Sequence, residues 1–150
     1  MARTAPTMHS RVMMTREIRG GCSCGAVRYR ATGTPEMQGI CHCRTCQRLS
    51  GGGHVGFICF PSGSVAIEGE TAVTRGPGGS GLPAERHFCP RCHSALFGLS
   101  DMIPGKTNIY AGTLDDTAQF TPTIAIFTRS RQAWERDPPG LKCFETLPGG

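Results

Sequence analysis

The sequence predicts a small, mainly β domain that is built from short strands and many turns. Its 150 residues include 21 Gly and 11 Pro, residues that interrupt regular structure and favour turns. Apolar runs are short and no heptad pattern is sustained, so long helices are not expected. Seven of the nine cysteines fall in three tight clusters, which is typical of metal-binding knuckles. A chain of this length can bury its own core as a single domain.

The N-terminal residues are expected to lie outside the fold. Residues 1–15 are polar and lack a clear period, which favours a flexible extension. We therefore expect one domain at residues 16–150. The first 18 residues contain no apolar run of the kind that a secretion signal needs, and no stretch of 18 apolar residues predicts a membrane span.

Alternation and turn residues predict the elements of this domain in order. Residues 26–31 alternate, which predicts a strand with Val27, Tyr29 and Ala31 on its core face. Residues 43–50 can form one or two helical turns that end at the following glycines. The other strand candidates are short segments bounded by turn residues, namely residues 38–41, 54–60, 64–70, 84–88, 94–99, 106–111 and 123–128.

Three segments carry more specific expectations. Residues 54–60 and 64–70 resemble a hairpin with a longer loop between its strands. The Gly/Pro-rich residues 75–83 predict a loop that is too short to divide domains, and residues 138–150 predict a Pro/Gly-rich tail.

Charge and cysteine usage favour a reduced, cytoplasmic setting and a small-molecule partner. Seven bound thiolates and two Zn²⁺ together contribute −3, which lowers the formal net charge of +5 to about +2. Lys and Arg are scattered singly, so a nucleic-acid partner is not expected, and neither is a membrane surface. The cysteine count is odd and Cys-x-Cys spacing is too tight for ordinary pairing, which argues against a disulfide framework.

The spacing of the clustered cysteines predicts metal binding. Four sulfurs make a closed structural zinc site, whereas three leave a position for water or substrate. Counting does not dictate the grouping, because the middle cluster could share ligands with either flank. One closed and one open site would use all seven sulfurs of the three clusters, which are Cys22 and Cys24, then Cys41, Cys43 and Cys46, then Cys89 and Cys92.

These motifs resemble the glutathione-dependent formaldehyde-activating family, which also includes the centromere protein V-type domains. The resemblance covers roughly residues 19–144 and its cysteine pattern is highly specific. It rests on residues 20–25 (GGCSCG), 41–51 (CHCRTCQRLSG), 88–92 (FCPRC) and 110–116 (YAGTLDD), and on the tail from Trp134 through Leu141 to Phe144.

The resemblance implies an Mss4-like fold of short antiparallel sheets with zinc knuckles and one short helix. It also implies two Zn²⁺ per chain and a carbon–sulfur lyase activity that, written in reverse, condenses formaldehyde with glutathione. The structural zinc would be bound by Cys22, Cys24, Cys89 and Cys92, and the catalytic zinc by Cys41, Cys43 and Cys46.

Two positions depart from the family pattern. The residue after the Phe-Cys-x-x-Cys motif is usually glycine, which suits a positive φ, but here it is His93. A histidine often follows the Pro-x-x motif near the C-terminus, where this chain has Ala125. Arg44 and Arg48 would share one face of the short helix and could receive glutathione carboxylates. His42 lies between two of the clustered cysteines and could orient a sulfur or a bound group, but its side chain is expected to face solvent.

The chemistry of an open three-cysteine zinc favours thiol binding. Three thiolates make the ion a poorer Lewis acid than a three-histidine site, but soft sulfur suits it as a fourth ligand. Binding would deprotonate the thiol at neutral pH and hold it beside an aldehyde. We therefore expect an enzyme that handles glutathione–aldehyde adducts. A zinc-stabilised module that binds another protein, and a carrier that binds glutathione without catalysis, are the rival interpretations.

Overall fold

The computed structural model describes residues 16–149, and the extension expected at residues 1–15 lies outside the described residues. This part of the chain is mainly β, as the sequence predicts, and α1 is its single α-helix. No helix in it is long and apolar enough to cross a membrane. The elements are β1 (Glu17–Gly21), β2 (Arg28–Thr32), β3 (Met37–Cys41), α1 (Arg44–Ser50), β4 (Val55–Pro61), η1 (Ser62–Ser64), β5 (Val65–Glu68), β6 (Ala72–Pro77), β7 (Pro83–Phe88), β8 (Ala95–Ser100), β9 (Lys106–Tyr110), η2 (Ala111–Thr113), η3 (Thr117–Gln119), β10 (Ile124–Ile126), η4 (Thr128–Ser130) and β11 (Lys142–Cys143).

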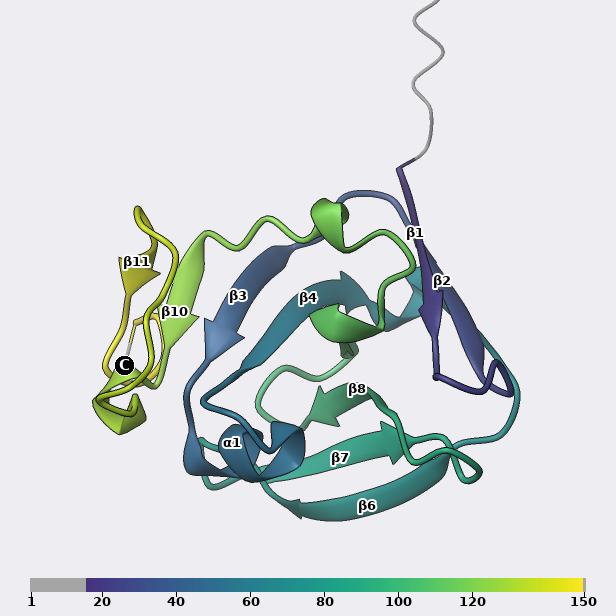
Figure 1. The fold of residues 1–150 in the computed structure, drawn as a ribbon, viewed down its shortest axis with the longest axis horizontal. Helices are drawn as coiled ribbons and strands as arrows, with labels where there is room; N and C mark the ends of the chain where they lie inside the picture. Colours follow the sequence, from purple (N-terminus) through teal and green to yellow (C-terminus); the bar gives the residue numbers. More distant parts are fainter. Residues whose placement is uncertain (1–15, 150) are drawn as a thin grey trace, which may run out of the picture.

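The strands form two sheets. A three-stranded sheet has the order β1-β2-β5, and an eight-stranded sheet has the order β11-β10-β3-β4-β9-β8-β7-β6. Figure 1 shows β1 and β2 at one side of the molecule, with β10 and β11 at the opposite side. Neighbouring strands are antiparallel except that β10 runs parallel to β3 and β11 runs parallel to β10. The expectation of antiparallel sheets is therefore wrong for this edge.

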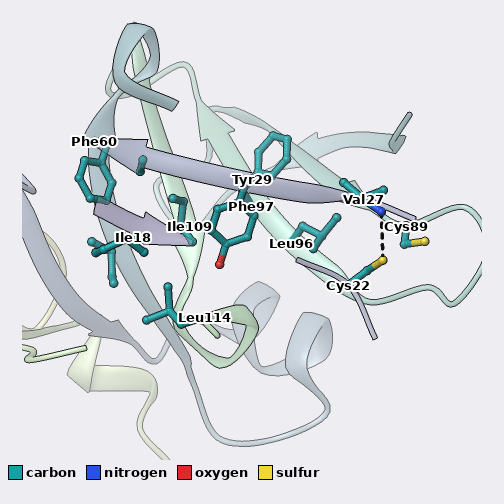
Figure 2. Packing of buried hydrophobic residues seen from close by; sticks show 12 residues of the cluster. Ile18, Cys22, Val27, Tyr29, Phe60, Cys89, Leu96, Phe97, Ile109 and Leu114 are labelled. Atoms are coloured by element: carbon teal, nitrogen blue, oxygen red, sulfur yellow. Dashed lines mark hydrogen bonds between the residues drawn. The ribbon is translucent and has the colours of Figure 1, made fainter. Parts of the chain in front are cut away.

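The main core lies between the small sheet and one face of the large sheet (Figure 2). Val27, Tyr29 and Ala31 are at most 3% exposed, so the alternation predicted for residues 26–31 is confirmed. Ile58 and Phe60 of β4 are fully buried against them. Burying large apolar side chains contributes roughly 1.5–3 kcal/mol for each residue.

The hairpin expected from residues 54–60 and 64–70 does not form. β4 lies between β3 and β9 in the large sheet, whereas β5 pairs with β2 in the small sheet. The turn η1 directs the chain from one sheet to the other. Ser62 fixes this turn, because its N–H donates to the carbonyl of Gly105 at 2.9 Å and its hydroxyl lies 2.8 Å from that of Thr107.

Two segments that were expected to be irregular form strands. β6 extends to Pro77, which pairs with Pro83, so only residues 78–82 of the expected loop connect β6 to β7. Proline is tolerated there because β6 is an edge strand. In the expected tail, β11 pairs with β10, and Phe144 N–H donates to the carbonyl of Ala125 at 2.9 Å.

The helical turns predicted for residues 43–50 are confirmed as α1. Cys43 caps its N-terminus, with its sulfur accepting the N–H of Cys46 at 3.3 Å. Gly51 caps its C-terminus with φ of 71°, a left-handed conformation that glycine adopts without steric cost. The N-terminal cap thus places the sulfur of Cys43 at the first turn of α1, which also carries Cys46.

The large sheet presents its second face to a cavity. Side chains alternate along a strand, so Ile58 and Phe60 of β4 reach the core while Phe57 and Cys59 point the other way. On β9, Ile109 is in the core, whereas Asn108 lines the cavity. The same sheet therefore stabilises the fold on one face and supports the candidate site on the other.

Candidate functional site

The first cysteine cluster brings together the four sulfurs of Cys22, Cys24, Cys89 and Cys92, all within 4.8 Å of one another. The sulfur of Cys24 lies 3.6 Å from that of Cys22 and 3.7 Å from that of Cys89. Four thiolates at about 2.3 Å from a tetrahedral Zn²⁺ would be about 3.8 Å apart. The residues present therefore fit a closed zinc site.

Backbone N–H groups hold the sulfurs of this cluster in place. Val27 N–H donates to the sulfur of Cys22 at 3.3 Å, and Figure 2 shows this bond at the end of the core. Arg91 N–H donates to the sulfur of Cys89 at 3.4 Å. A hydrogen bond from Ser94 at 3.2 Å lowers the pKa of the Cys92 thiol to about 5. Such bonds favour thiolates, the form that binds metal.

This cluster joins the two sheets. Cys22 and Cys24 follow β1 in the small sheet, whereas Cys89 and Cys92 lie between β7 and β8 of the large sheet. A metal bound here would connect elements that are far apart in the sequence, which is the role of a structural zinc.

The second cluster consists of Cys41, Cys43 and Cys46, whose sulfurs also lie within 4.8 Å of one another. Cys41 ends β3, Cys43 caps α1 and Cys46 lies in its first turn. Hydrogen bonds from Cys41 and then Cys46 lower the pKa of the Cys43 thiol. The pKa of the Cys41 thiol is raised. The largest cause is its hydrogen bond with Cys43, in which Cys41 keeps the proton.

These opposed pKa shifts indicate what the second cluster can bind. Three adjacent sulfurs cannot all ionise beside one another without a cation, so the protein alone favours one thiolate with two thiols donating to it. A divalent soft metal would allow all three to ionise, and cysteine thiolates suit zinc. In residues 16–149 no fourth His, Cys, Asp or Glu atom belongs to this group. The donor set therefore fits an open three-sulfur site.

A cavity of about 570 Å³ adjoins the three sulfurs, which form part of its wall. Its floor is the face of the large sheet opposite the core, and Phe57, Met102 and Ile103 are among its apolar lining residues. The loop between β6 and β7 approaches closely, because a Cβ at Gly79 would stand only 3.0 Å from the sulfur of Cys43. A cavity with mainly apolar walls beside a candidate metal site is typical of small-molecule binding.

The cations of the cavity differ from those that the sequence suggested. Arg44 and Arg48 are exposed on α1 and are not among the residues that line the cavity. Arg86 of β7 and Lys106 of β9 line it instead. Lys106 forms an ion pair with Glu36, another lining residue. The role expected for the helix arginines stays a prediction.

The expectation that His42 faces solvent is wrong. Its side chain is fully buried, with Nε2 2.8 Å from a carboxylate oxygen of Asp137 and Nδ1 3.3 Å from the carbonyl of Gly53. His54 stands edge-on to it, with ring centroids 5.7 Å apart, and its Nδ1 forms a hydrogen bond with the carboxylate of Glu135. These contacts attach the segment after η4 to the knuckle that carries the second cluster.

The structure also locates the two departures from the family pattern. His93 has a φ of 64°, the left-handed conformation for which glycine is suited. Ala125 is fully buried in β10, in register with Ile40 of β3, and is not among the residues that line the cavity. Ile126, its neighbour, does line it.

Comparisons with known proteins agree with this arrangement. A family model described as "Glutathione-dependent formaldehyde-activating enzyme" matches residues 17–130. A curated Halomonas elongata protein named "Putative glutathione-dependent formaldehyde-activating enzyme" is 32% identical over 149 residues, which cover 87% of this chain and 88% of that protein. A crystal structure of a Rhodobacter sphaeroides protein has a TM-score of 0.52 and 16% identity, covering 65% of this chain and 87% of that one, a likeness of fold alone. On the family match and the Halomonas relative, the chain belongs to the glutathione-dependent formaldehyde-activating family.

Proposed function

We propose that this protein is a zinc-dependent enzyme that joins glutathione, or a related thiol, to an aldehyde at Cys41, Cys43 and Cys46. The family and the name of the Halomonas relative support the choice of glutathione and formaldehyde. The observation that carries the proposal is the position of the three sulfurs in the wall of the 570 Å³ cavity. A ligand in that cavity can reach the cluster, which a purely structural site would not need.

The proposed reaction forms one carbon–sulfur bond. The thiol sulfur attacks the carbonyl carbon, the carbonyl electron pair moves to oxygen, and that oxygen takes the proton that the thiol loses. The product is a hemithioacetal, and the reverse reaction is that of a carbon–sulfur lyase. A Zn²⁺ at the three cysteines would supply a position for a thiolate ligand and lower the pKa of its thiol.

The residues around the cluster have defined parts in this proposal. Cys41, Cys43 and Cys46 supply three sulfurs from one short stretch of chain, so the remaining side of the site faces the cavity. Phe57 and Phe127 line the cavity and exclude water from the reacting atoms. Holding both reactants in one cavity removes much of the entropic cost of their encounter.

The first experiment is calorimetric titration of glutathione into zinc-loaded protein, with S-methylglutathione as the blocked-thiol control. We expect the free thiol to bind more tightly, because only it can supply a thiolate. Cys43→Ser should remove this advantage, while Cys59→Ser should keep it, since Cys59 lines the same cavity without belonging to the cluster. Equal binding of the two probes by the wild-type protein would contradict the proposal.

Turnover separates the enzyme from a glutathione carrier. The rate of hemithioacetal formation should exceed the spontaneous rate and fall to it in Cys43→Ser. Thiol-dependent binding without acceleration would identify a carrier, and binding of neither probe would favour a protein-interaction module. A reduced cytoplasmic setting suits the proposal because the ligating thiols must stay reduced. The Mss4-like description of the fold and the lyase class stay predictions.

A further inference from the structure

Three polar side chains converge at one point on the cavity floor. Gly98 of β8 pairs directly with Asn108 of β9 on one side and with Arg86 of β7 on the other. Directly paired residues lie on the same face of a sheet. Arg86, Gly98 and Asn108 therefore share one face, and all of them line the cavity. The hydroxyl of Tyr110 reaches the same place, because a Cβ at Gly98 would stand 2.6 Å from it. We call Arg86, Asn108 and Tyr110, around Gly98, the Gly98 patch.

The hydrogen-bonding capacity of the Gly98 patch is largely unused by the protein. The side-chain oxygen of Asn108 is buried and has no hydrogen-bond partner in the described chain. Arg86 makes one long contact, from Nη2 to the carbonyl of Pro77 at 3.4 Å, and no carboxylate of residues 16–149 pairs with it. Buried polar groups are nearly always paired, so a group that the protein leaves unpaired in a cavity is available to a polar ligand.

The charge at the patch is positive and uncompensated. Of the other charged residues that line the cavity, Lys106 and Glu36 pair with each other, and Glu85 pairs with Arg75 at 3.0 Å. Apart from the cysteine cluster, this leaves Arg86 as the charged side chain without an ion-pair partner among the described lining residues. Tyr110, Arg86 and the three sulfurs of the second cluster line the same cavity, so the patch and the proposed thiol site face one space.

We propose that the Gly98 patch recognises an amino-acid-type end of the thiol ligand, meaning a carboxylate with an N–H group beside it. Arg86 binds the carboxylate with paired N–H donors, and the Tyr110 hydroxyl donates to the same group. The oxygen of Asn108 accepts from the neighbouring N–H. This inference rests on the proposed function and adds the substrate class to it, since both ends of glutathione carry this combination.

The position of the patch favours Arg86 over the helix arginines as the partner of a carboxylate. Arg44 and Arg48 are exposed on α1, where water screens their charge. Arg86 is half-buried on the floor of a cavity with mainly apolar walls, where a carboxylate is attracted more strongly than on the open surface. In this proposal the patch binds a carboxylate end of the ligand, and the cysteine cluster binds its thiol.

The test compares three probes on zinc-loaded protein by calorimetry: glutathione, S-methylglutathione, and glutathione with both carboxylates esterified. Arg86→Gln should weaken binding of the first two about 10- to 100-fold, the range for a lost charge-assisted hydrogen bond. The ester should bind wild type and Arg86→Gln equally weakly. Arg30→Gln is the matched control, because Arg30 is exposed on β2 and does not line the cavity, and it should leave all three affinities unchanged. Arg86→Lys should restore part of the affinity, because it keeps the charge but loses the paired donors.

The outcomes separate the patch from the proposed function. If Arg86→Gln binds glutathione as tightly as wild type does, the proposed role of the Gly98 patch is rejected, while thiol binding at the cysteine cluster is unaffected. Arg86-dependent binding of S-methylglutathione that equals binding of glutathione would support the patch and reject the role of the thiol. Wild-type protein that binds the ester as tightly as glutathione, or that binds none of the probes at millimolar concentration, would overturn the patch without using a variant. Zinc content and circular dichroism of each variant show that it folds.

Discussion

His93 occupies a backbone conformation that most residues avoid. Its φ is 64°, and its N–H donates to the carbonyl of Cys89 at 2.9 Å, which closes the knuckle that carries Cys89 and Cys92. A side chain in the left-handed region costs about 1–2 kcal/mol, whereas glycine adopts it freely. The preference of the family for glycine at this position therefore has a physical reason, and this chain departs from it at a cost in stability.

We expect His93→Gly to stabilise the zinc-loaded protein by about 0.5–1 kcal/mol. Relief of the left-handed strain outweighs the greater chain entropy of glycine in the unfolded state. Urea unfolding at a fixed free zinc concentration measures the change.

Gly25 offers the matched control. Its φ is 81° and no atom lies within 4 Å of the position a Cβ would take, so Gly25→Ala introduces backbone strain without a clash. It should destabilise the protein by about 1 kcal/mol. Lower stability of His93→Gly would show instead that the imidazole makes a favourable contact at the knuckle.

The segment after η4 acts as an element of the site although it has little regular structure. Asp137 accepts from His42 at 2.8 Å, and Gln47 of α1 donates to the carbonyl of Ser130 at 2.8 Å. Leu147 and Pro148 then line the cavity. The segment thus covers the knuckle of the second cysteine cluster and completes the cavity wall.

Asp137→Ala should destabilise the protein by about 1–3 kcal/mol, because the buried ring of His42 loses its partner. Asp137→Asn keeps an acceptor and should cost less. Limited proteolysis should also cleave the segment after Ser130 faster in the alanine variant. The control is Asp115→Ala, which removes an exposed pair with Arg28 and should cost less than about 1 kcal/mol. Equal effects of the two alanine substitutions would contradict an anchoring role for Asp137.

The elements that the sequence predicted incorrectly depend on distant partners. Residues 54–60 and 64–70 have strand patterns, but η1 is held by Gly105 and Thr107, so the two strands enter different sheets. β11 is only two residues long and exists because β10 offers it an edge. Local patterns identify strands, whereas the choice of partner is set by packing across the whole chain.

At the scale of the molecule, some parts of the candidate site follow from local sequence spacing, whereas others depend on packing between distant segments. The cysteine clusters could be predicted because their spacing within each cluster is local and chemically specific. Arg86, Asn108 and Tyr110 carry no such motif. They meet only because β7, β8 and β9 pair in a particular register, which places Gly98 between Arg86 and Asn108. A cavity floor of this kind becomes visible only when the sheet is known.

The two cysteine clusters occupy different positions in the architecture. The first joins residues that follow β1 to the turn between β7 and β8, so it ties the small sheet to the large one. The second takes its three sulfurs from residues 41–46 alone and connects no distant elements. Metal at the first cluster should therefore stabilise the fold, while metal at the second should serve binding.

This difference predicts that zinc leaves in two steps with different consequences. A chelator should release the second-cluster zinc first, because that site faces the cavity, and far-UV circular dichroism should stay unchanged. Release of the second equivalent should coincide with unfolding, since binding free energy at a structural site is folding free energy. Cys43→Ser should fold with one zinc, whereas Cys24→Ser should cost about 4 kcal/mol or more. If the far-UV circular dichroism of the strands is lost with the first equivalent of zinc, both clusters are structural. Equal stability of Cys43→Ser and Cys24→Ser would lead to the same conclusion.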